Sequence, residues 1–154
     1  MPDVLAIGSL DGVLAATSIA LAAVRSLDDS NSSIVDCLDL TAELNTLEST
    51  LKVIYQTMTL QFQQNQIFAD IINDITRRCR RDMEKFCDNV GSYHKGRSRR
   101  GPRRWAYKIL WTIWKKSEVI AFRGKISRYQ ARLNTCLQFQ LLCVQLAFMQ
   151  NQEC

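Results

Sequence analysis

A seam of apolar residues between positions 40 and 58 constrains the fold of this chain more than any other feature. Its members are spaced 4, 3, 4, 3 and 4 residues apart, which keeps them on one face of an α-helix. They are Leu40, Leu44, Leu47, Leu51, Ile54 and Met58. The seam predicts a helix over about residues 34–62, and because it covers fewer than three heptads, we expect its partner within the same chain.

The rest of the chain has the same helical character. Six glycines and two prolines in 154 residues are too few for the many turns of a β-sandwich, and 47% hydrophobic residues suffice for one core. We expect further helices over about residues 3–27, over about 66–87 and from Trp105 to near the C-terminus, where Ser117 offers the start of a fifth. Residues 1–154 are therefore predicted to form one all-α domain, a bundle of four to five helices with an apolar first helix.

The two later helices are also defined by apolar stripes. The stripe of the third helix consists of Ile67, Ile71, Ile75, Cys79, Met83 and Phe86. The stripe of the last helix consists of Val119, Phe122, Ile126, Tyr129 and Leu133, with positions 136 or 137, 140, 143 or 144, and 147. Between these helices, Asn89-Val90-Gly91 predicts a helix stop, and a mobile basic loop is expected over about residues 89–104.

Small residues recur every four positions in the first predicted helix. This small-residue stripe consists of Gly8, Gly12, Ala16 and Ala20. Such a stripe lets a second helix approach closely, as in membrane helix pairs, so it is a candidate surface for self-association or membrane contact. Asp11 and an uninterrupted apolar run of only about thirteen residues favour a buried bundle helix over a bilayer span of about twenty. Conditional insertion into a membrane stays open.

Charge is divided unequally between the two halves of the chain. Residues 1–76 contain two basic and ten acidic side chains, a net −8, whereas residues 77–154 contain eighteen basic and five acidic ones, a net +13. The halves should attract each other, so we expect part of the charge to be neutralised within the molecule. The pI of about 9.0 is therefore not by itself a sign of nucleic-acid binding.

The strongest candidate for a binding site is the basic tract over residues 77–116, which also contains all three tryptophans. The residues predicted to contact lipid or phosphate are Arg97, Arg99, Arg100, Arg103, Arg104, Trp105 and Lys108. Cations beside tryptophans suit an anionic membrane surface, and the same cations suit the phosphates of nucleic acid. An arginine surface neutralised by the acidic half, with buried tryptophans, is as well supported as these two interpretations together.

No motif of an enzyme, a cofactor site or a metal site appears in the sequence. The glycine-rich phosphate loop, the dinucleotide fingerprint, the serine-hydrolase elbow and the zinc-protease motif are all missing. The six cysteines form no C-x-x-C pair, and His94 is the only histidine, which disfavours both a zinc site and a nucleophile such as Cys87 paired with His94. We expect a non-enzymatic protein without a cofactor or metal. Reduced thiols and a start without a secretory signal predict a cytoplasmic location.

Two parts of the chain resemble the fungal N-terminal helical domains of the HeLo-like group, which precede NACHT-type and related nucleotide-binding domains of NLR-like (STAND) proteins. The first match is Met1-Pro2-Asp3-Val4-Leu5-Ala6-Ile7-Gly8, followed by Gly12 and a helix rich in Ala and Leu. The second is Arg104-Trp105-Ala106-Tyr107-Lys108, followed by Lys115, Lys116, Ile120, Ile126, Tyr129, Ala131, Leu133 and Leu137. The basic segment 97–104 departs from the family pattern.

The resemblance implies a helical signalling bundle, active in some relatives in programmed cell death or incompatibility. In relatives that act at membranes, the helix matching Val4 to Val24 is thought to insert after oligomerisation. We therefore carry forward a signalling or interaction module that works by self-association or with a protein partner, recruited from the cytoplasm to an anionic membrane. The alternatives are a basic nucleic-acid-binding protein, and a structural adaptor that docks a partner helix on Gly8, Gly12 and Ala16.

Overall fold

The computed structural model describes residues 4–28, 34–60, 66–97 and 104–153, and side chains over 9–27, 35–59, 66–92 and 113–153. These residues form four helices and no strand. The helices are α1 (Val4–Asp28), α2 (Ile34–Leu60), α3 (Gln66–Arg97) and α4 (Arg104–Gln152). The predicted all-α bundle with an apolar first helix is confirmed, with four helices.

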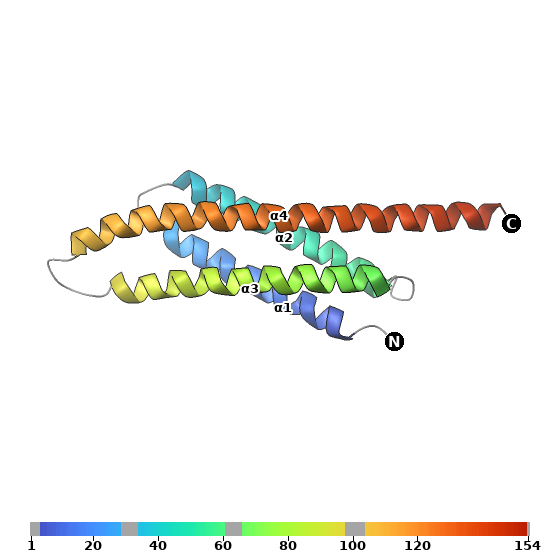
Figure 1. The fold of residues 1–154 in the computed structure, drawn as a ribbon, viewed down its shortest axis with the longest axis horizontal. Helices are drawn as coiled ribbons and strands as arrows, with labels where there is room; N and C mark the ends of the chain where they lie inside the picture. Colours follow the sequence, from blue (N-terminus) through green and yellow to red (C-terminus); the bar gives the residue numbers. More distant parts are fainter. Residues whose placement is uncertain (1–3, 29–33, 61–65, 98–103, 154) are drawn as a thin grey trace.

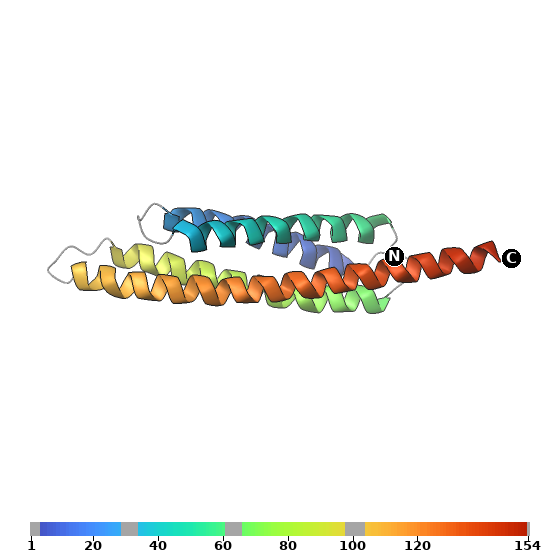
Figure 2. The same ribbon diagram turned by 90° about the horizontal axis from the view of Figure 1, so that it is seen from above.

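The four helices are arranged as two antiparallel hairpins in two layers. Figure 2 shows α1 and α2 in one layer and α3 and α4 in the other. Across the layers, α1 contacts α3 and α2 contacts α4, and the directions visible in Figure 1 make each of these two pairs parallel. Each helix therefore has two principal neighbours and buries two adjacent faces against them.

The seam of α2 lies at the centre of the core, as its spacing predicts. Leu40, Leu44, Leu47, Leu51 and Ile54 are fully buried, and Met58 is almost so. The seam serves packing within the chain. On the adjacent helix, α1 buries the apolar residues Leu10, Val13, Ala16, Ala20, Leu21, Val24 and Leu27.

One described segment, Ser9–Leu27 of α1, is long and apolar enough by length and composition to cross a bilayer, with a mean hydropathy of 1.5. In this fold the same segment supplies a core face, while Ile19 on the opposite face is 60% exposed. A core helix of a bundle passes the same test of length and hydropathy.

The predicted stripe of α3 is wrong at its beginning. Ile67 and Ile71 are 70% and 45% exposed, and Phe68 and Ile72 are buried in their place. The reason is geometric, because each step of four residues turns a side chain by about 40° around the helix, so a stripe made only of such steps drifts off one face. The buried set mixes steps of three and four: Phe68, Ile72, Ile75, Cys79, Met83, Phe86 and Val90.

The basic loop predicted over residues 89–104 is wrong for residues 89–97, which form the last turns of α3. Val90 continues the buried stripe, and the amide of Asn89 donates a 3.0 Å hydrogen bond to Glu118 of α4, so both side chains favour continued helix. Residues 98–103 lie outside the described part of the chain. The last helix has no break at Ser117, and α4 runs through it without interruption.

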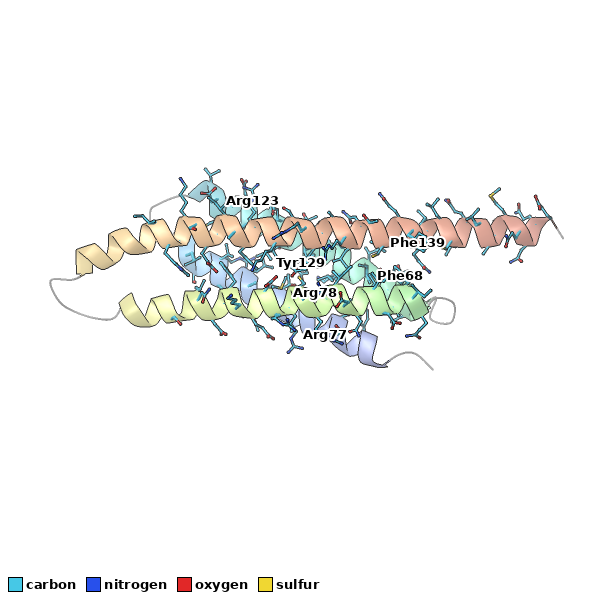
Figure 3. The ribbon with its side chains drawn as sticks, viewed as in Figure 1. Phe68, Arg77, Arg78, Arg123, Tyr129 and Phe139 are labelled. Atoms are coloured by element: carbon cyan, nitrogen blue, oxygen red, sulfur yellow. The ribbon has the colours of Figure 1, made fainter. Side chains whose placement is uncertain are left out.

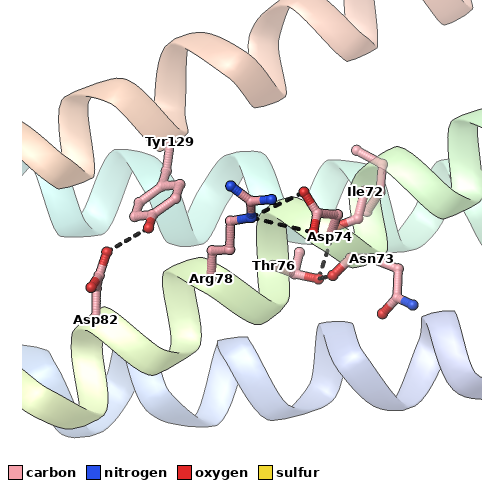
Figure 4. Close-up of polar contacts among 7 residues, drawn as sticks. All are labelled: Ile72, Asn73, Asp74, Thr76, Arg78, Asp82 and Tyr129. Carbon is pink, nitrogen blue, oxygen red and sulfur yellow. Dashed lines mark hydrogen bonds and ion pairs between the residues drawn. The ribbon is translucent and has the colours of Figure 1, made fainter.

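Polar side-chain contacts join the helices at several places. Arg123 of α4 pairs with Asp39 and Glu43 of α2 at 3.0 and 2.7 Å. These two ion pairs link the basic half of the chain to its acidic half, as the charge asymmetry predicts. Within the second layer, Asp82 of α3 accepts a hydrogen bond from Tyr129 of α4 (Figure 4). Lys125 of α4 donates a second hydrogen bond to the same carboxylate. Another polar contact, between Lys115 of α4 and Leu27 of α1, lies at the candidate site.

Candidate functional site

Four of the predicted lipid or phosphate contacts have a described backbone, and these four lie at one end of the bundle. Arg97 is the last residue of α3, whereas Arg104, Trp105 and Lys108 belong to the first turns of α4; only the backbone of these four residues is described. Arg99, Arg100 and Arg103 lie outside the described residues. Figure 1 places the end of α3 and the start of α4 side by side, beyond the ends of α1 and α2. The fold thus brings the residues directly before and directly after segment 98–103 to the same end of the bundle.

The sequence around the junction of α3 and α4 is strongly basic. Between Asp88 and Glu118 the chain contains nine basic residues and no acidic one. We call this segment, residues 89–117, the cationic end. Its basic residues are Lys95, Arg97, Arg99, Arg100, Arg103, Arg104, Lys108, Lys115 and Lys116. The carboxylates that neutralise Arg123 and Lys125 lie further along the bundle.

The described side chains of the cationic end combine apolar and basic character. Ile113 is 65% exposed, and Lys116 follows on the same face of α4 and is also exposed. Ile120, just beyond the cationic end, continues this face and is 51% exposed. Trp114 is half-buried and packs on the core. A helix face that offers isoleucine side chains beside a lysine resembles the amphipathic surfaces that lie in a membrane interface.

Lys115 has a structural role at this end. Its side chain is buried, and the ammonium donates a 2.6 Å hydrogen bond to the carbonyl oxygen of Leu27. The last four carbonyl groups of a helix have no partner within the helix, and a cation there also opposes the negative end of the helix dipole. Lys115 therefore holds the C-terminal turn of α1 against α4 and is withdrawn from the exposed basic surface.

The small-residue stripe of α1 faces the rest of the chain. Ala16 and Ala20 are buried in the core, and Gly8 lies on the part of α1 for which only the backbone is described. A Cβ built at Gly12 would lie 2.5 Å from Nη1 of Arg80, so the guanidinium of α3 passes directly over this glycine. In this conformation the stripe allows α3 to approach α1, and a partner helix would reach Ala16 only if α1 left the bundle.

The opposite end of the molecule contains an apolar surface that the sequence argument did not identify. Figure 1 shows α4 continuing past the start of α3 and the end of α2. In this α4 tail (residues 139–152), Gln140 is the only buried side chain. Seven large apolar side chains there are 37–64% exposed. They are Phe139, Leu141, Leu142, Val144, Leu146, Phe148 and Met149.

Two signals in the sequence indicate this tail. Residues 133–152 include no charged side chain, which is unusual for a helix that meets water on all sides. In addition, Phe139, Leu142, Leu146 and Met149 are spaced 3, 4 and 3 residues apart, on the face that points away from the bundle. The stripe predicted for α4 contains positions of the inward face up to residue 147 and none of the outward face.

Several of the described thiols are buried, and several of the described carboxylates are paired with basic side chains. Burial raises the pKa of the Cys79 thiol to about 12, and it also raises the pKa of Cys87, with Asp88 and Glu84 adding to the effect. Glu43 is paired with Arg123, and Glu48 with Lys52 at 3.0 Å. Within the described residues, no three His, Cys, Asp or Glu side chains are grouped so as to hold a metal ion.

No protein-family model, curated protein sequence or solved structure matches this chain. The resemblance to HeLo-like domains therefore stays a prediction from the quoted residues. The evidence on function comes from the fold, the cationic end and the α4 tail.

Proposed function

We propose that this chain is a non-enzymatic interaction module that self-associates and binds an anionic membrane surface through its cationic end. The observation that carries the proposal is the cationic end itself, with nine basic residues and no acidic one at the junction of α3 and α4. A run of cations without an acidic residue in the same segment favours binding to an anionic surface.

The energy available at the cationic end is sufficient for reversible recruitment. A basic residue close to an anionic leaflet contributes about 1 kcal/mol, so four or five engaged cations supply about 4–5 kcal/mol. Exposed Ile113 and Ile120 beside Lys116 add apolar contact at the interface. Because this attraction is screened within about 10 Å at 0.1 M salt, membrane binding is expected to be salt-sensitive.

The HeLo-like resemblance gives this activity its cellular setting. A module of that kind, held in the cytoplasm until triggered, would signal in programmed cell death or incompatibility. The length and hydropathy of Ser9–Leu27 are compatible with later insertion of α1, which would require the loss of its core contacts and of the Lys115–Leu27 hydrogen bond. Recruitment through the cationic end does not depend on that step.

Vesicle flotation tests the proposal. The purified chain is expected to float with phosphatidylcholine vesicles that contain phosphatidylserine, and not with vesicles of phosphatidylcholine alone. Replacing Arg97, Arg99, Arg100, Arg103 and Arg104 with Ala should abolish flotation. The matched control removes five other exposed cations, none of which forms an ion pair with a described side chain: Arg77, Arg81, Lys85, Arg128 and Arg132.

The control variant loses the same charge elsewhere, so equal loss of flotation in both variants would mean that overall charge, and not the cationic end, recruits the chain. The competing nucleic-acid function predicts a different pattern. It requires binding to duplex or single strands that weakens steeply with salt, without flotation. That result would replace the membrane proposal with the nucleic-acid one.

A further inference from the structure

The outward face of the α4 tail forms a seam without a partner among the described residues. Phe139, Leu142, Leu146 and Met149 are 57–63% exposed, and we call these four residues the outward stripe. Their 3, 4, 3 spacing is the spacing of the α2 seam, whose six residues are all buried. The same spacing is therefore buried against other helices of the chain in α2 and exposed in the α4 tail. Figure 3 labels Phe139 on α4 and Phe68 on α3, near the point where the tail continues past the start of α3.

We propose that the outward stripe and the flanking apolar side chains of the α4 tail bind the same surface on a second copy of this chain. The inference deepens the proposed function, because it locates the self-association that the function requires. It also places that association at the end of the molecule opposite the cationic end. A homodimer about a two-fold axis uses one surface twice, so the tail needs no other patch on the molecule.

Charge favours a second copy over a different partner. The twenty residues from Leu133 to Gln152 are uncharged, so two tails meet without repulsion. A heterologous helix is commonly selected by charges that flank an apolar seam, and the tail offers none. The polar side chains of the tail are instead amides, among them Gln145, Gln150 and Gln152, which both donate and accept hydrogen bonds and can therefore pair with amides of a second copy.

The available area fits a dimer of modest affinity. At roughly 100 Å² of exposed surface for each large apolar side chain, the four residues of the outward stripe offer about 400 Å² per copy. Adding Leu141, Val144 and Phe148 raises this to about 700 Å², close to the about 800 Å² per partner of a standard interface. Because two helices in contact do not cover every side of each other, we expect dissociation constants on the order of micromolar.

Sedimentation equilibrium over a wide range of protein concentration, without lipid, tests this inference. The wild-type chain is expected to pass from monomer to dimer. Leu142→Gln with Leu146→Gln removes two members of the outward stripe without adding charge or lowering helix propensity, so the fold should persist. The double variant should dissociate at least about tenfold more easily. Leu142→Glu with Leu146→Glu should be monomeric throughout.

The matched control changes two equally exposed apolar residues on α2, as Leu38→Gln with Val53→Gln, and should dimerise like the wild type. A wild-type chain that stays monomeric overturns both the inference and the proposed self-association. If the wild type dimerises and the tail variants dimerise equally well, the α4 tail is not the interface, but self-association itself stands. A tail that captures a different helix while the wild type stays monomeric likewise contradicts the second copy as its occupant.

Discussion

The ammonium of Lys115 donates a 2.6 Å hydrogen bond to the carbonyl oxygen of Leu27, joining the start of α4 to the last turn of α1. This contact connects the two parts of the chain for which membrane contact was predicted. It lies within the cationic end, and it helps to retain the one described helix that is apolar enough to enter a bilayer. Its loss should loosen the end of α1 before the rest of the bundle.

Replacing Lys115 with Ala should lower the free energy of unfolding by about 1–3 kcal/mol, because it leaves a buried carbonyl without its charged donor. Urea unfolding measures this loss, and amide hydrogen exchange should become faster in the last turn of α1. Lys116→Ala is the control, since Lys116 is exposed and its loss should change stability by less than about 0.5 kcal/mol. Equal effects of the two substitutions would contradict the role given to Lys115.

Two neighbouring isoleucines test the corrected register of α3. Ile72 is fully buried, so Ile72→Ala should destabilise the fold by about 2–5 kcal/mol through lost apolar burial and a cavity. Ile71 is 45% exposed, and Ile71→Ala should cost much less. Urea denaturation of both variants checks the prediction. A larger loss at Ile71 than at Ile72 would restore the stripe predicted from the sequence.

Gly124 lies in the middle of α4 and is exposed, and a Cβ placed there would meet no atom within 4 Å. Gly124→Ala should therefore raise the free energy of unfolding by about 0.5–1 kcal/mol, because alanine restricts the unfolded chain and favours helix. Thermal or urea unfolding measures the gain. A destabilised variant would indicate that α4 bends or breaks at this position, contrary to the continuous helix.

Alkaline pH should destabilise the bundle through groups whose pKa is higher in the folded chain. Burial raises the pKa of Cys79 from 9.0 to about 12, and burial together with the hydrogen bond to Asp82 raises the pKa of Tyr129. Between about pH 9 and pH 12, the Cys79 thiol is largely deprotonated in the unfolded chain and still protonated in the folded chain. The unfolded chain therefore binds fewer protons, and the free energy of unfolding decreases as the pH rises above about 9. The slope from Cys79 is up to about 1.4 kcal/mol per pH unit.

Urea unfolding at about pH 8 and about pH 10.5 measures that slope. Cys79→Ala, although less stable at both values, should lose less stability between them than the wild type does. A variant with the same pH dependence as the wild type would show that Cys79 ionises as easily in the folded chain as in the unfolded one.

Burial was predicted most accurately where the apolar residues of a helix fit only one of its faces. The α2 seam alternates steps of three and four, so one helix face satisfies it and all six residues are buried. In α3 two apolar faces compete over residues 67–72, and packing against α1 and α4 selects Phe68 and Ile72. Local helix-stop signals at Asn89 and Gly91 were overridden by tertiary contacts, the buried Val90 and the hydrogen bond to Glu118.

The candidate site was predictable in part. A run of basic residues without acids is visible in the sequence, but its position at one end of the bundle depends on the hairpin of α3 and α4. The α4 tail was not foreseen because a stripe of apolar residues does not reveal whether another helix lies beside it. That depends on the relative lengths of the helices, and α4 is the longest of the four.

The three tryptophans of the chain, Trp105, Trp111 and Trp114, all lie within the segment that forms the cationic end, so their fluorescence reports on this segment alone. Titrating the wild-type chain with phosphatidylserine-containing vesicles therefore tests membrane binding by the cationic end most directly. We predict a saturable blue shift of the emission that salt reverses and that pure phosphatidylcholine vesicles do not produce. Emission that stays unchanged at saturating anionic lipid would contradict the proposed function.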